Sequence, residues 1–324
     1  MKRVLALTIA LLLCVGACQK AVPVASKTEL LLDTVVTITL YDRTDTALID
    51  QAMDEIRRLE GLLSVEKEGS DLYRLAEMAG KAWVEIAPET EYVLRVAKEY
   101  ESLSGGYFDI TAGPLIELWN IRDNAGHYPT TEELTAARAL ISSDELLVES
   151  GRAYLTKAGM RANLGAIAKG YIADCVKTLL VKEGVTSGVI DLGRNILLIG
   201  SEGEQPFRIG VQDPFHADGA RIGVLSATDQ SIVTSGIYER YFEYEGKRYH
   251  HILDPFSGYP SDNGVASVTI LSQKSIDGDA LSTTCLLLGK EKGLALIESL
   301  PETEALFIMT DGTRILSSGM ELEQ

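Results

Sequence analysis

The sequence predicts an α+β fold, a single large domain of mixed sheets flanked by helices. Segments with the 3.6-residue period of helices and segments that alternate like strands are interspersed, without the regular strand–helix–strand period of a doubly wound sheet. No internal repeat is visible in the 324 residues. Hydrophobic residues make up 46% of the chain, which suffices for one large domain or two tightly joined lobes to bury a core.

Local patterns predict each element in turn. Thr34 to Leu40 alternates β-branched residues, which is typical of a strand. Asp45 is expected to cap a helix that runs to Leu63 with apolar residues at helical spacing. A second helix is expected to begin at Pro88 and to stop at Gly105 and Gly106, with Val93, Val96, Tyr100 and Leu103 facing inward. A third helix is expected at 166–183, closed by Gly184, and is followed by a strand pair at 188–200 that is interrupted at Gly193. The last expected strands are 266–271, 305–310 and 314–318, and the final two flank a hairpin turn at Asp311-Gly312.

Residues 1–17 are expected to be a signal peptide. Lys2 and Arg3 precede an apolar run of about twelve residues, too short for a membrane span, which needs roughly twenty. The run ends in Val-Gly-Ala before Cys18, which resembles the lipobox at which bacterial lipoproteins are cut and lipidated; simple secretory cleavage nearby is the alternative. We therefore expect an exported lipoprotein, anchored in a membrane and facing the periplasm or cell surface, with a tether at 18–27 and the functional domain at 28–324.

The chain is strongly acidic, with 30 Lys and Arg against 47 Asp and Glu. Nucleic-acid binding is disfavoured, because it needs a basic stripe and no cluster of Lys or Arg is present. An anionic substrate would need a bound cation or backbone amides to hold it. Cys175 and Cys285 are too few for a disulfide scaffold, and their apolar surroundings favour small buried residues.

The segment 275–289 is the most informative candidate site. If a helix begins near Asp279, then Asp279, Ser282 and Thr283 project from one face, because they are spaced i, i+3 and i+4. One carboxylate and two hydroxyls are hard oxygen ligands that suit Mg²⁺ or Ca²⁺ rather than Zn²⁺. Taken alone, the segment favours a structural interpretation, in which Asp277 or Asp279 only caps the helix and the hydroxyls bond the previous turn.

The segment 162–174 places two glycines and a lysine at the mouth of a helix. Exposed amides there, together with Lys169, would form an anion site. The spacing of a P-loop is missing. Alternatively, Gly165 and Gly170 serve only close packing.

Two other segments have mixed interpretations. His250 and His251 would serve as a metal pair or a general base, although a pair without a third ligand is more often structural. Tyr107, Phe108 and Asp109 would suit one wall of a pocket for a planar ring, or equally an ordinary buried loop.

In their order along the chain, these segments resemble the successive motifs of the ApbE family. The resemblance extends over roughly residues 30 to 290 and is carried by LLDTVVTITLYD, GGYFDITAGPL, NLGAIAKGYIAD, IDLGRN, FRIGVQDP, the TSGIYERYF to HHILDPFSGYP block, and DGDALSTT. Each signal is weak by itself. Their common order makes coincidence improbable.

The resemblance implies an FAD-binding α+β fold and Mg²⁺-dependent transfer of FMN from FAD to a Thr or Ser of a partner protein, with release of AMP. A subunit of a redox complex is one candidate partner. The implied magnesium ligands are Asp279, Thr283 and the carbonyl of Ala166, with Ser282 near them. His251 would be the base, with His250 as a second candidate. Flavin and adenosine contacts would fall on Leu32, Glu66, Tyr107, Phe108, Asp109, Asn163, Lys169 and Leu253.

The sequence departs from the family pattern at three positions. An aromatic residue is expected near Glu66, an Asp is frequent where Asn163 stands, and Gly193-Arg194 replaces Gly-Gly. Two other functions remain open. One is an FAD pyrophosphatase of the same fold that releases FMN and AMP, and the other is a non-catalytic lipoprotein that binds FAD.

Overall fold

The computed structural model describes residues 22–121, 125–216 and 219–324. The expected signal peptide and Cys18 lie outside these residues and stay predictions. Strand β1 (Ala25–Leu31) begins inside the segment for which the sequence predicts a tether. Within the described ranges, no helix is both long enough and apolar enough to span a bilayer.

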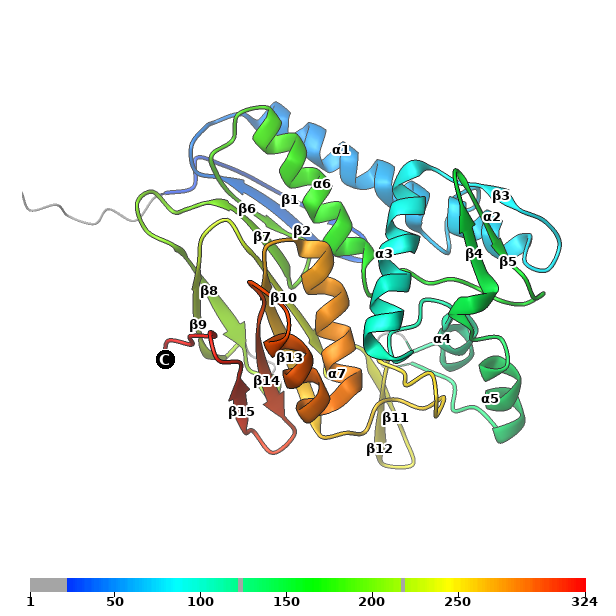
Figure 1. The fold of residues 1–324 in the computed structure, drawn as a ribbon. Coiled ribbons are helices and arrows are strands. Elements are labelled where there is room, and N and C mark those ends of the chain that lie inside the picture. Colours follow the sequence, from blue (N-terminus) through cyan, green and yellow to red (C-terminus); the bar gives the residue numbers. More distant parts are fainter. Residues whose placement is uncertain (1–21, 122–124, 217–218) are drawn as a thin grey trace, which may run out of the picture.

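An eight-stranded sheet forms the centre of the described chain (Figure 1). The strand order is β1-β2-β6-β7-β10-β13-β14-β15, and every neighbouring pair is antiparallel. After β1, the strands are β2 (Thr34–Leu40), β6 (Ser187–Asp191), β7 (Asn195–Gly200), β10 (Ser231–Gly236), β13 (Val265–Ser272), β14 (Glu304–Met309) and β15 (Arg314–Leu316). The predicted α+β class is confirmed, because the strands are antiparallel and the long helices are separate from them.

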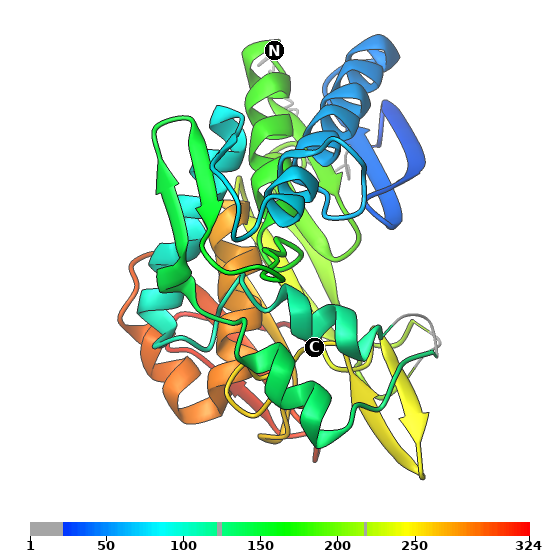
Figure 2. The ribbon, with the colours of Figure 1, turned by 90° about the vertical axis from the view of Figure 1, so that its right-hand side faces the viewer.

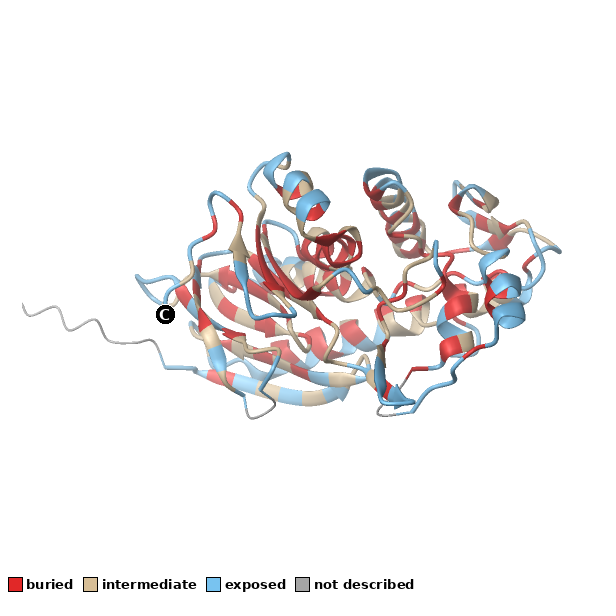
Figure 3. Ribbon diagram, turned by 90° about the horizontal axis from the view of Figure 1, so that it is seen from below, coloured by how far each residue is buried: buried red, intermediate tan, exposed pale blue. Residues whose placement is uncertain are grey.

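Three long helices cover one face of this sheet: α1 (Thr46–Leu63), α6 (Ala168–Lys182) and α7 (Ser275–Glu298). Val268 and Ile270 of β13 belong to the core on the helical side. Leu306 and Ile308 of β14 pack on the opposite side, under the strand pair β8 (Phe207–Gln212) and β9 (Arg221–Ala227). β13 and β14 are therefore buried on both faces, because nearly all of their residues are buried. Figure 3 colours the buried residues of the ribbon red.

The remaining elements form a second region beside the sheet. They are α2 (Asp71–Glu77), β3 (Val84–Glu85), α3 (Pro88–Ser104), α4 (Gly113–Trp119), α5 (Thr131–Arg138), a 3₁₀ turn (Ser143–Glu145), β4 (Leu146–Glu149), β5 (Arg152–Leu155) and the hairpin β11 (Tyr241–Tyr244) and β12 (Lys247–His250). Figure 2 shows this hairpin in yellow beside α4 and α5.

Trp119, the last residue of α4, packs against the hairpin. Its indole nitrogen donates to the carbonyl of Gly258 at 2.7 Å, and its ring stacks on Tyr249 with the centroids 5.6 Å apart. Aromatic packing of this kind stabilises a two-stranded hairpin that would be marginal alone. The loop after β12, which carries His251, is thereby held against α4.

Most local predictions are confirmed. Asp45 caps α1 by accepting from the backbone of Leu48 at 3.0 Å, and α3 starts at Pro88 and ends at a left-handed Gly105. β14 and β15 form the predicted hairpin. Two predictions are wrong in detail, because Leu103 is 45% exposed and the helix predicted from residue 279 already starts at Ser275.

Candidate active site

The candidate site lies where the N-terminal ends of α6 and α7 cross. Gly170 makes this crossing possible, since a Cβ there would lie 2.2 Å from the carbonyl oxygen of Ser275. The glycine therefore serves close packing, which is one of the two interpretations that its sequence allows. Gly165 instead lies in the turn before α6, where its N–H donates to the side chain of Asn163 at 2.8 Å.

Asp279 points from α7 to the first turn of α6. Its side chain is buried, and Oδ2 accepts a hydrogen bond from the N–H of Gly170 at 2.9 Å. Gly170 lies in the first turn of α6, where backbone N–H groups have no acceptor within the helix. Asp279 therefore supplies the acceptor that the N–H of Gly170 lacks within α6.

Burial raises the pKa of Asp279. The charge of Lys169 and the hydrogen bond from Gly170 act in the opposite direction. The carboxylate is thus desolvated, and it lies among groups that favour its ionised form. It does not cap α7, because it lies one turn inside the helix, and Asp277 accepts from the hydroxyl of Tyr100 at 2.8 Å. The capping interpretation is wrong for both residues.

Ser235 of β10 brings the two hydroxyls of α7 together. Its Oγ lies 2.8 Å from Oγ of Ser282 and 3.3 Å from Oγ1 of Thr283. Ser282 is fully buried and also donates to the backbone carbonyl of Asp279 at 2.9 Å. Thr283 is only half-buried, so it is the more accessible hydroxyl. The sequence did not single out Ser235, because its role depends on the pairing of a strand with a distant helix.

Lys169 lies among carboxylates from three elements. Burial raises the pKa values of Asp191, Glu239 and Asp279, and the charge of Lys169 opposes each of these shifts. Within the described part of the chain, no group of three or more His, Cys, Asp and Glu side chains is placed to hold a metal ion. A metal at this crossing would therefore need hydroxyl and carbonyl ligands as well as carboxylate.

His251 has the protonation pattern of a general base. Its Nδ1 lies 3.2 Å from the carbonyl oxygen of Arg240, a contact that requires the proton on Nδ1 and leaves the lone pair on Nε2. Burial lowers the pKa of His251 to about 4, with the charge of Lys169 contributing in the same direction. The imidazole is therefore neutral at pH 7.

His250 is bonded within its own loop through both ring nitrogens. Nε2 lies 2.9 Å from the carbonyl oxygen of Ser261, and Nδ1 accepts from the N–H of Ile252 at 3.3 Å. Burial lowers the pKa of His250 as well. The geometry therefore favours His251 over His250 as the base.

The three residues after Gly106 have different environments. Phe108 is buried in the main core with its ring 6.0 Å from that of Tyr100. Tyr107 packs edge-on against Phe256 at 4.9 Å. Asp109 accepts from the N–H and the hydroxyl of Thr111, both at 2.7 Å, and it borders a surface hollow that Phe256 also lines.

The other predicted flavin contacts are spread over separate loops. Leu32 and Asp33 form the two-residue turn between β1 and β2, both with φ of 55°. Positive φ is uncommon for residues other than glycine and recurs at functional sites. Leu253 is buried in the cluster around Trp119, and Glu66 is exposed beyond α1. The flavin contacts assigned to these residues stay predictions.

The turn at Gly193 and Arg194 also departs from ordinary backbone geometry, with φ of 70° at both residues. The Arg194 guanidinium donates to Glu239 at 3.1 Å and lies over the ring of Tyr238 at 4.9 Å. The arginine is therefore accommodated where the family pattern has a second glycine.

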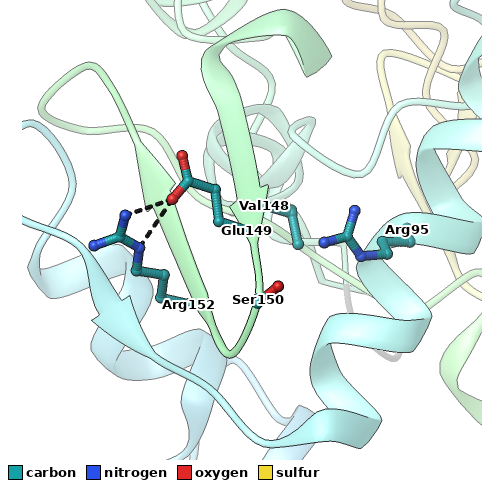
Figure 4. Close-up of a pocket in the computed structure, with 5 residues that line it drawn as sticks. All are labelled: Arg95, Val148, Glu149, Ser150 and Arg152. Atoms are coloured by element: carbon teal, nitrogen blue, oxygen red, sulfur yellow. Dashed lines mark hydrogen bonds and ion pairs between the residues drawn. The ribbon is translucent and has the colours of Figure 1, made fainter.

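A separate open hollow lies between α3 and the β4–β5 hairpin (Figure 4). Arg95 and Arg152 line it, but both guanidinium groups already have carboxylate partners. Arg152 donates to Glu149 at 3.0 Å, as the dashed lines show, and Arg95 donates to Glu91 at 2.7 Å. None of the residues predicted for the site lines this hollow.

The fold and site define an α+β protein in which a buried carboxylate, neighbouring hydroxyls and a lysine lie at the crossing of two helices, and the charge of the lysine reaches a neutral imidazole. The chain belongs to the ApbE family, whose profile matches residues 32–307. This confirms the resemblance seen in the sequence motifs.

Named relatives and solved structures agree with this membership. The chain is 37% identical to an FAD:protein FMN transferase of Klebsiella pneumoniae (strain 342), over 92% of this chain and 93% of the relative. It is 35% identical to one of Treponema pallidum (strain Nichols), over 94% and 91%. The flavin transferase ApbE from Vibrio cholerae superposes with a TM-score of 0.81 at 27% identity, covering 91% of this chain and 97% of that chain.

We expect Gly170→Ala to destabilise the protein by about 1–3 kcal/mol, the usual effect of overpacking. The added methyl would meet the backbone of Ser275, which cannot rotate away. Urea unfolding followed by circular dichroism measures the change. Gly61→Ala is the matched control, because nothing lies within 4 Å of its Cβ in α1. An equal loss in both variants would contradict the tight crossing.

Proposed function

We propose that the protein is an Mg²⁺-dependent enzyme that transfers FMN from FAD to a Thr or Ser hydroxyl of a target protein and releases AMP. The names of its relatives, which it matches over nearly their whole length, support flavin transfer. The single observation that carries the metal part is the hydrogen bond from the N–H of Gly170 to Asp279, because it holds a buried carboxylate at the first turn of α6, which directly follows Ala166 and Ile167.

The residues present fit a magnesium ion. Asp279, Thr283 and the Ala166 carbonyl are hard oxygen donors, and Mg²⁺ commonly takes few protein ligands and completes its shell with water and phosphate oxygens. When bound, Mg²⁺ supplies positive charge that neutralises a pyrophosphate and stabilises its leaving group. In an acidic protein with 47 Asp and Glu, such a cation would offset the repulsion of an anionic substrate.

Two residues of the chain would accept the proton of the acceptor hydroxyl and hold the phosphates of FAD. Nε2 of His251 accepts the proton of the acceptor hydroxyl as its oxygen bonds to the phosphorus on the FMN side of FAD. The bond between that phosphorus and the bridging oxygen breaks, and AMP leaves with this oxygen. Lys169 contributes a point charge to the phosphates from the first turn of α6.

The test is incubation of the purified protein with FAD, Mg²⁺ and periplasmic or surface proteins, followed by a denaturing gel read by flavin fluorescence. We expect flavin fluorescence on an acceptor protein, with AMP formed in equal amount, and the mass of the labelled peptide identifies the residue. Free FMN and AMP without a labelled protein would establish a pyrophosphatase instead. Retained FAD without AMP would establish a binding protein.

We also propose that the mature chain is a lipoprotein attached through Cys18, on the evidence of the N-terminal sequence. Several acyl chains anchor a protein firmly, since each buried methylene contributes about 0.8 kcal/mol. Cys18→Ser should therefore move the protein from the membrane fraction to the soluble fraction. Recovery of this variant in the membrane fraction would refute the anchor.

A further inference from the structure

The start of α7 is held by a carboxylate from another helix. The residue before α7, Lys274, makes no capping hydrogen bond with its side chain. Instead, Asp174 of α6 accepts from the N–H of Ser275 at 2.9 Å through one oxygen and from the N–H of Ile276 at 3.0 Å through the other. These N–H groups have no partners within α7, because the first turn of a helix lacks them. Asp174 therefore caps the N-terminus of α7, although it lies about 100 residues earlier in the chain.

Each of the two helices supplies a carboxylate that binds the first turn of the other. Asp174 of α6 binds the first turn of α7, and Asp279 of α7 binds the first turn of α6 at Gly170. Ser275 and Asp279 are separated by about one helical turn. A shift of the α7 start would therefore move Asp279 directly.

Two further bonds hold the same turn from other elements. The hydroxyl of Ser275 donates to the side-chain oxygen of Asn195 in β7 at 2.6 Å. The amide of Asn195 also lies close enough to Asp279 to lower its pKa. Asp277 accepts from Tyr100 of α3 at 2.8 Å. Of these contacts, only the one from Asp174 is made by an ionisable group to the backbone of α7.

We propose that Asp174 is a positioning residue for the metal site, which fixes the place of Asp279 by holding the first turn of α7 against α6. The inference rests on the proposed magnesium site. A carboxylate suits this task because each of its two oxygens accepts one N–H, whereas the amide of Asn has a single acceptor oxygen.

The ionised form of Asp174 lowers rather than raises the stability of the fold. Burial raises its pKa to about 6, with Asp277 acting in the same direction, while the bonds from Ile276 and Ser275 and the charge of Lys177 oppose the shift. A raised pKa means that the stability contributed by the protonated form is lost as the pH rises through about 6. At neutral pH the ionised form of Asp174 is therefore less favourable for the stability of the fold than the protonated form would be.

The experiment is a calorimetric titration of Mg²⁺ into the wild type, Asp174→Ala and Asp174→Asn at pH 8. Loss of a group that orients a metal ligand commonly weakens metal binding by roughly 10- to 100-fold, and we expect this for Asp174→Ala, with a smaller effect for Asp174→Asn. In the transfer assay, the Mg²⁺ concentration for half-maximal rate should rise while kcat at saturating Mg²⁺ stays near the wild-type value.

Asp45→Ala is the matched control. It removes a carboxylate cap of the same kind from α1, where Asp45 accepts from Leu48 at 3.0 Å, and it should leave Mg²⁺ affinity unchanged. If Asp174→Ala does not fold by circular dichroism, Asp174→Asn decides. Folded Asp174 variants with wild-type Mg²⁺ affinity would overturn the positioning role. A wild type that binds no Mg²⁺ would instead overturn the proposed metal site.

Discussion

Asp279→Ala is expected to abolish FMN transfer. Removal of one preorganised electrostatic group commonly lowers a rate by roughly 10²- to 10³-fold, and we expect a larger loss of rate here. Asp279 is the only side-chain carboxylate in the proposed magnesium site, and it also binds the backbone of Gly170. Its removal takes away the proposed ligand and the hydrogen bond to the first turn of α6. The rate of flavin labelling of an acceptor at saturating Mg²⁺ measures the effect.

The same variant should remain folded. Burial raises the pKa of Asp279, so its ionised form lowers the stability of the fold as the pH rises through the folded pKa, and removing the charge relieves this cost. Asp279→Asn keeps the volume of the side chain and controls for the cavity that alanine leaves. Normal flavinylation by either variant in Mg²⁺ would show that the metal assignment is wrong.

His251→Ala is expected to slow transfer by roughly 10²- to 10⁴-fold, the usual contribution of a general base, while FAD still binds. Its Nε2 carries the lone pair because Nδ1 donates to the carbonyl of Arg240. Single-turnover labelling measures the rate, and quenching of flavin fluorescence measures FAD binding. A rate within a few-fold of the wild type would exclude His251 as the base.

His250→Ala separates the two histidines. It removes two hydrogen bonds with the loop backbone, so its main expected effect is lower stability, without the large loss of rate at a temperature where it is folded. The reverse result would make His250 the base.

The pH dependence gives a further check on His251. Because burial lowers its pKa to about 4, the base form is available throughout neutral and mildly acidic pH. The stability that the neutral form of His251 contributes to the fold is present above the unfolded pKa of about 6.5 and is lost as the pH falls through about 4. A fall in transfer near pH 6 that persists in Asp174→Asn would contradict this assignment.

Local sequence patterns predicted the elements whose signals lie within a few residues. The alternation of β2, the Asp45 cap of α1, the Pro88 start of α3 and the hairpin between β14 and β15 are all present. Backbone preferences, caps and tight turns act over short stretches, so they can be predicted without knowledge of the fold. The start of α7 was misjudged because its cap, Asp174, comes from another helix.

The residues of the candidate site were likewise predicted from the sequence only in part. The motifs pointed to Asp279, Lys169 and His251, and the structure brings the charge of Lys169 close enough to shift the pKa values of the other two. The motifs did not identify Ser235, and they named His251 as the base with His250 as a second candidate, without a physical reason to separate the two. Those answers depend on strand pairing and on the Arg240 carbonyl.

The sequence by itself determined the α+β class, the acidic charge, the expected export signal and the family, because these follow from composition, periodicity and the order of motifs. Only the tertiary structure decided which groups meet at the crossing of α6 and α7. The reason is physical: burial, hydrogen-bond partners and pKa shifts arise from contacts between residues far apart in the chain. Asp174 and Asp279, each bound to the first turn of the other's helix, are the clearest case.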